Sequence, residues 1–155
     1  MAVLLDQTEY LREHYGYELW MLRELHNRMV EPQVFHAFDF VIRNACIEAF
    51  CVHARALIDF FATQPSGKNR STDVVADLFC PGFSTAIDGG SAAFNVKVNK
   101  QIAHLTQERA SPIKVNGIDF AIVRTTIETQ HRRFHASLSL ALAEIVPPPD
   151  DRFSP

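Results

Sequence analysis

The sequence predicts an all-α protein, a single bundle of four to five helices. Apolar residues recur at steps of three and four along most of the chain, which places them on one side of a helix. The 155 residues include only 6 glycines but 12 phenylalanines, a composition that favours long elements over many turns. No segment alternates apolar and polar residues in the way that a half-buried strand does.

The first predicted helix covers residues 6–29, and the second covers residues 33–63. Pro32 separates them, because the residue before a proline avoids the α region. Gly16 weakens the middle of the first helix by about 1 kcal/mol relative to alanine and marks a bend. The second helix is apolar around most of its circumference, so we expect it to lie centrally and to pack on more than one side. The first helix has an apolar stripe formed by Leu11, Tyr15, Leu19, Leu22 and Leu25.

The remaining predicted elements follow a loop, PSGKNRS, and a short helix, DVVADLF. Residues 92–107 resume helical spacing, and the Asn116-Gly117 pair indicates a turn. Residues 119–145 form the last long helix, whose apolar stripe includes Ile127 and Phe134. We expect one domain over residues 1–146 and a proline-rich tail over 147–155, because consecutive prolines cannot continue a helix.

Charge and cysteine usage narrow the class of protein. The net charge of −3 argues against a strongly basic nucleic-acid binder, although a local basic patch is compatible with that total. Cys46 and Cys51 point to different sides of one helix, and with Cys80 they are expected to be free and buried. The start, MAVLLDQTEY, lacks a signal-peptide pattern, and no apolar stretch is long enough to span a bilayer. We therefore expect a cytoplasmic protein with no membrane partner.

Polar residues interrupt the apolar second helix on one narrow face: Asn44, Glu48, Arg55 and Asp59. Charges in such a setting are costly unless they are paired. One interpretation pairs Arg55 with Asp59 along the helix and Glu48 with Arg109 or Lys100 of a neighbouring helix. The alternative is that the stripe lines a functional cleft.

The segment NKQIAHLTQER carries a second set of candidate residues. Lys97, Lys100 and His104 share one flank of the predicted helix, while Asn99 lies on the opposite flank. Neighbouring positive charge disfavours protonation of His104, and neutral histidine can serve as a general base. The alternative is a half-buried histidine that forms a hydrogen bond with a neighbouring helix.

A third set lies in ETQHRRFHASL, where Glu128, His131 and His135 are spaced so that they share a helix face. Carboxylate-bridged metal sites in bundles need a second such motif on another helix, and the sequence lacks one. Arg132 and Arg133 also add positive charge beside the three residues. We therefore expect no metal and no cofactor. Glycine-rich nucleotide loops and the usual hydrolase motifs are absent as well.

The helices EAFCVHARALIDFF and NKQIAHLTQER resemble those of the HEPN-like (higher eukaryote and prokaryote nucleotide-binding) superfamily, and of a narrow group of uncharacterised bacterial proteins within it. The resemblance covers roughly residues 38–109. It implies a bundle of four or five helices that dimerises around a shared cleft with an arginine, four to six residues and a histidine. His104 matches that histidine, and Glu48 or Asp59 matches the supporting acidic residue.

The arginine of that motif is replaced in this chain. Asn99 or Lys97 stands at its position, and lysine cannot grip a phosphate through a planar fork. Lys100 or Arg109 would have to act from a displaced position. We therefore predict a non-catalytic protein that binds nucleic acid, a nucleotide or a protein partner through a His104-centred cleft formed with Lys97, Asn99, Lys100 and Arg109.

Two alternatives stay open. The first is an active metal-independent ribonuclease of toxin or phage-defence type, with His104 as the catalytic residue. The second is a metal-dependent helical-bundle enzyme built on Glu128, His131 and His135. A homodimer is expected through the face that bears Lys97, Lys100 and His104.

Overall fold

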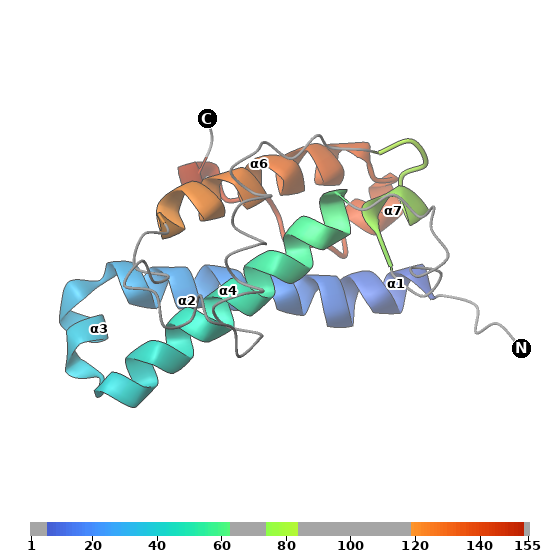
Figure 1. The fold of residues 1–155 in the computed structure, drawn as a ribbon. Coiled ribbons are helices and arrows are strands. Elements are labelled where there is room, and N and C mark those ends of the chain that lie inside the picture. Colours follow the sequence, from blue (N-terminus) through green and yellow to red (C-terminus); the bar gives the residue numbers. More distant parts are fainter. Residues whose placement is uncertain (1–5, 63–73, 84–118, 154–155) are drawn as a thin grey trace, which may run out of the picture.

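The computed structural model describes residues 6–62, 74–83 and 119–153 (Figure 1). All regular elements in these ranges are helical, which confirms the predicted all-α bundle. The α-helices are α1 (Gln7–Glu9), α2 (Gly16–Val30), α3 (Pro32–Ala37), α4 (Phe40–Ala62), α6 (Phe120–Ser137) and α7 (Leu140–Ala143). The tighter or wider turns are the π-helical η1 (Tyr10–Tyr15) and the 3-10 helices η2 (Ala76–Leu78) and η6 (Asp151–Phe153).

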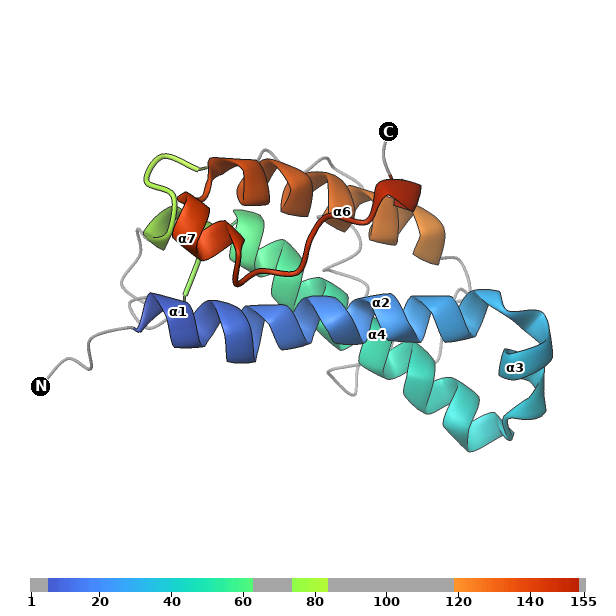
Figure 2. The same cartoon turned by 180° about the vertical axis from the view of Figure 1, so that it is seen from behind.

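The first predicted helix is continuous, and its parts α1, η1 and α2 form the long rod in Figure 2. Asp6 caps its start by accepting hydrogen bonds from the backbone N–H groups of Thr8 and Glu9. The irregularity expected at Gly16 is a π-helical turn, in which the Gly16 N–H donates to the Leu11 carbonyl five residues earlier. The predicted apolar stripe is buried: Leu11, Tyr15, Leu19, Leu22 and Leu25.

The prediction of one helix over residues 33–63 is wrong, because the chain turns between α3 and α4. Pro32 takes the first turn of α3, where its missing N–H costs nothing. Phe38 is extended, and the Asp39 carboxylate then accepts from the Ile42 N–H at 2.9 Å and begins α4. Within the described residues 74–79 of the segment DVVADLF, where a short helix was expected, the regular structure is the 3-10 turn η2.

The expectation that this apolar helix lies centrally holds only for the second half of α4. Its buried side chains begin at Phe50, whereas Phe40 and Val41 are 70% and 72% exposed. Figure 2 shows the reason: the α3 end of the bundle extends past α6, so that the start of α4 has no helix above it among the described elements.

The last predicted helix is also divided, because α6 ends at Ser137 and Leu138 is extended before α7. The segment that was expected to be a tail packs against the bundle. Residues 147–153 run back between α6 and α2, as the last stretch of chain in Figure 2 shows. We call residues 147–153 the C-terminal strap. Its carbonyl and carboxylate oxygens accept hydrogen bonds from arginines of α2 and α6, which holds it in place.

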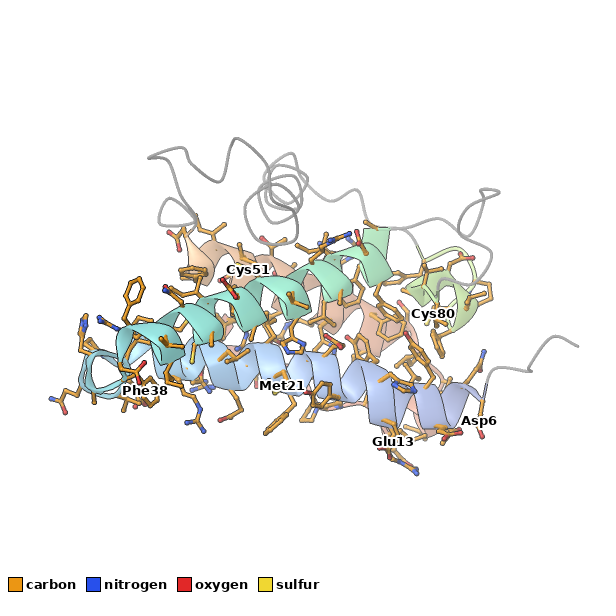
Figure 3. The ribbon with its side chains drawn as sticks, turned by 60° about the horizontal axis from the view of Figure 1, so that its bottom comes forward. Asp6, Glu13, Met21, Phe38, Cys51 and Cys80 are labelled. Carbon is orange, nitrogen blue, oxygen red and sulfur yellow. The ribbon has the colours of Figure 1, made fainter. Side chains whose placement is uncertain are left out.

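The centre of the bundle is aromatic, and side chains fill the space between α2 and α4 in Figure 3. Neighbouring ring centroids in this cluster lie 4.8–6.2 Å apart, mostly with tilted or edge-to-face geometry. The cluster consists of Tyr15, Phe60, Phe61, Phe79 and Phe134. Cys51 and Cys80 are buried and free as predicted, while the free Cys46 is half-buried. No helix in the described residues combines the length and hydropathy needed to cross a bilayer.

Candidate functional site

The residues predicted to form the His104-centred cleft lie outside the described part of the chain. They are Lys97, Asn99, Lys100, His104 and Arg109. Every lysine of the protein also falls outside it. Two other sets of candidates lie within the described residues. The first is the set of polar residues on one face of α4, which we call the α4 stripe: Asn44, Glu48, Arg55 and Asp59. The second is the set formed by Glu128, His131 and His135.

The α4 stripe contains the predicted ion pair. Arg55 Nε lies 3.6 Å from Asp59 Oδ2, one helical turn away, and the two side chains are 38% and 44% exposed. This confirms the interpretation that Arg55 and Asp59 pair along the helix. Glu48 is exposed and Asn44 is half-buried on the same helix. Lys100 and Arg109, which were the expected partners of Glu48, lie outside the described residues.

The third set of candidates belongs to a buried ionic cluster. Glu128 of α6 is fully buried, and Arg23 of α2 binds both of its carboxylate oxygens with Nε and Nη2 at 2.8 Å. Arg124, one turn earlier on α6, donates from Nε to the same carboxylate at 2.9 Å. Two guanidinium groups thus surround one carboxylate, and the bidentate geometry is the strongest form of such a pair.

The C-terminal strap supplies the second carboxylate of the cluster. Asp150 accepts from Arg124 Nη2 at 3.0 Å and from Arg152 Nη2 at 2.8 Å. The ring of Phe153 lies 4.5 Å from the Arg124 guanidinium carbon and covers it with a cation–π contact. Arg23 also donates to the Pro148 carbonyl at 3.0 Å. The strap therefore completes the charge balance of a fully buried arginine.

The cluster keeps both carboxylates ionised. Burial raises the pKa of Glu128, but the hydrogen bonds and charges of Arg23 and the charge of Arg124 outweigh it, so this pKa lies below its ordinary value. The hydrogen bond from Arg152 lowers the pKa of Asp150 to about 2. Neither group has the raised pKa that a general acid needs at neutral pH.

His131 is buried beside this cluster and both of its ring nitrogens are bonded. Its Nε2 lies 2.9 Å from the Pro147 carbonyl, which can only accept, so Nε2 carries the proton. Its Nδ1 therefore accepts from the Tyr15 hydroxyl at 2.7 Å. Burial lowers the pKa of His131 to about 4, which keeps the imidazole neutral.

The predicted metal candidates do not form a metal site. Glu128 is occupied by two arginines, and His131 is occupied by Tyr15 and Pro147. His135 is the remaining member, and its ring centroid lies 5.9 Å from that of His131. Among the described residues, no group of three or more histidine, cysteine, aspartate or glutamate side chains could hold a metal ion.

Sequence reasoning found Glu128 and His131 but missed their partners. Arg124, Glu128 and His131 are four and then three residues apart and share the buried face of Ile127, a spacing that could have indicated an inward-facing ionic cluster. Arg23 and Asp150 gave no such signal, because their roles depend on contacts with distant segments.

The cluster stabilises the packing of α2, α6 and the strap, and it presents no open reacting group. No protein-family model matches the chain, and no match is found among curated proteins or among solved structures.

Proposed function

We propose that the chain is a non-catalytic cytoplasmic binding protein whose partner is a second copy of itself. The observation that supports this most is the exposed apolar start of α4, which we call the α4 face: Phe40, Val41 and Ile42, at 70%, 72% and 45% exposure. Adjacent large apolar side chains on a protein surface mark interaction sites.

A homodimer suits this face because a two-fold interface uses the same patch on both subunits. Charge also favours a protein partner over nucleic acid, because the net charge of the protein is −3. The free state of all three cysteines is in keeping with a reducing compartment.

The resemblance to HEPN-like proteins supports the same proposal from the sequence. It assigns His104 and an acidic residue of α4, Glu48 or Asp59, to one cleft at a dimer interface, together with Lys97, Asn99, Lys100 and Arg109. A His104-centred cleft that has lost its motif arginine would bind rather than cleave. Dimerisation through α4 would bring two such clefts together.

Light scattering after size-exclusion chromatography tests the proposal. We expect a dimer at micromolar concentration, and we expect Val41→Asp to be a monomer because it places a carboxylate in the interface. Ile122→Asp on α6 is the matched control, since Ile122 is also largely exposed, and it should remain a dimer. A wild-type monomer at all concentrations, or equal effects of the two variants, would contradict the proposal.

A ribonuclease assay separates binding from catalysis. The wild-type protein should leave structured and single-stranded RNA intact, with and without EDTA. Cleavage by the wild type that is lost in His104→Ala would instead establish the ribonuclease alternative.

A further inference from the structure

A cavity of about 320 Å³ opens beside the π-helical turn, and Tyr15 and Glu18 are among the residues that line it. Its walls come from η1 and the start of α2, from the C-terminal half of α4 and from Val74. Its volume is at the lower end of the range for small-molecule sites. The side chains that give it chemical character are Tyr10, His14, Tyr15, Glu18 and Phe60.

The π-helical turn places both tyrosines at this cavity. In an α-helix, residues five apart point about 140° away from each other. The wider turn of η1, bonded from residue 16 back to residue 11, brings positions 10 and 15 closer to one side. Gly16 permits this turn, because a Cβ atom there would lie 3.2 Å from the Leu11 carbonyl oxygen. Such single π turns are frequent at functional sites.

The cavity lining is aromatic. The Tyr15 and Phe60 ring centroids are 4.8 Å apart, and those of Tyr10 and His14 are 5.2 Å apart. Aromatic faces attract cations, and the attraction grows where water is excluded.

The charge of the cavity is negative. Glu18 is the one carboxylate among the described lining residues, and none of them is lysine or arginine. His53 holds this carboxylate at the wall through a contact of 2.6 Å between Nδ1 and Oε2. Burial and then the charge of Glu18 raise the pKa of Tyr10, which also lines the cavity, so the field of the carboxylate reaches a second lining residue.

We infer that this cavity binds a small organic cation with apolar substituents, of the alkylated ammonium class. Tyr10, Tyr15 and Phe60 supply the aromatic surface, and Glu18 supplies the counter-charge. An anion would meet the Glu18 carboxylate without a compensating cation in the lining. A bare metal ion would find a single carboxylate, too few oxygen ligands for a hard cation.

Isothermal titration calorimetry tests this inference at constant ionic strength. It compares the affinity of the protein for choline with its affinity for 3,3-dimethylbutan-1-ol, the neutral isostere of choline. Choline should bind saturably, and the isostere should bind at least tenfold more weakly because it lacks the charge. Equal affinities, or no binding of choline up to tens of millimolar, would overturn the inference.

Substitutions of lining residues then test whether choline binds in this cavity. Glu18→Gln should weaken choline binding about tenfold, while Glu13→Gln should leave it unchanged, because Glu13 projects from the same rod but away from α4 in Figure 3. Tyr10→Phe should retain binding and Tyr10→Leu should lose it, since only the first keeps an aromatic face. Circular dichroism confirms that each variant is folded. Equal effects of Glu18→Gln and Glu13→Gln, or binding by Tyr10→Leu that matches the wild type, would also overturn it.

Discussion

Two arginine–carboxylate pairs of this molecule have the same sequence spacing and opposite environments. Arg124 and Glu128 on α6 are fully buried with a contact of 2.9 Å, whereas Arg55 and Asp59 on α4 are 38% and 44% exposed at 3.6 Å. Each pair spans one helical turn. The difference shows that helical spacing predicts which two charges form a pair. It does not predict how much the pair contributes to the stability of the protein.

The two pairs contribute differently to stability because their exposure to water differs. Water screens the exposed pair, so that its contribution to stability is small. The buried pair has lost its hydration, and each charge depends on the partners that replaced the water. Around Glu128 those partners are Arg23 and Arg124, and around Arg124 they include Asp150 of the strap.

The sharpest way to test this contrast is to remove one charge from each pair. Glu128→Gln should lower the free energy of unfolding by about 3–5 kcal/mol, because two guanidinium groups lose their shared carboxylate in the interior. Asp59→Asn, the matched exposed variant, should cost at most about 1 kcal/mol. Urea denaturation measures both, and similar losses for the two variants would contradict the contrast.

Acid should weaken the buried region through its histidines. His131 has a pKa of about 4 in the folded protein, while an unfolded histidine titrates near 6.5. The contribution of neutral His131 to the free energy of unfolding is therefore fully present above pH 6.5 and is lost as the pH falls towards 4. Burial also lowers the pKa of His26, which adds to the loss in the same direction.

From His131 alone, the free energy of unfolding should be about 2 kcal/mol lower at pH 5 than at pH 7. Urea titrations at the two values measure this. His131→Gln should remove most of the pH dependence, and His14→Gln, at an exposed position, should preserve it. A wild-type stability that is unchanged between pH 7 and pH 5 would count against a buried neutral His131.

The strap offers a further test, because its two adjacent aspartates, Asp150 and Asp151, provide an internal control. Asp150→Asn should cost about 1.5–3 kcal/mol, because Asp150 forms a charge-assisted hydrogen bond with the fully buried Arg124. Asp151→Asn should cost about 1 kcal/mol or less, since Asp151 is 90% exposed in its pair with Arg132. Thermal or urea unfolding would distinguish a packed strap from a loose tail, for which both substitutions would be neutral.

Much of the fold could be predicted, because the signals are local. The stripe that includes Leu11 and Leu22 identified the buried side of the first helix, and Ile127 and Phe134 did the same for α6. The break before α4 was missed although Asp39 is a capping residue, since the apolar pattern continues through Phe38. The candidate site was predicted less well: the Arg55–Asp59 pair was found, but Glu128 was considered as a metal ligand.

Local patterns in the chain are enough to predict the helical class, most of the buried apolar positions and the pairing of Arg55 with Asp59. These follow from backbone hydrogen bonding and side-chain periodicity within a few turns. Long-range packing, in contrast, determines that Glu128 is enclosed by arginines, that the strap lies against α2 and α6, and that the first half of α4 is exposed. Arg23 and Glu128 are 105 residues apart, so their contact depends on how α2 and α6 pack and has no periodic signature in the chain.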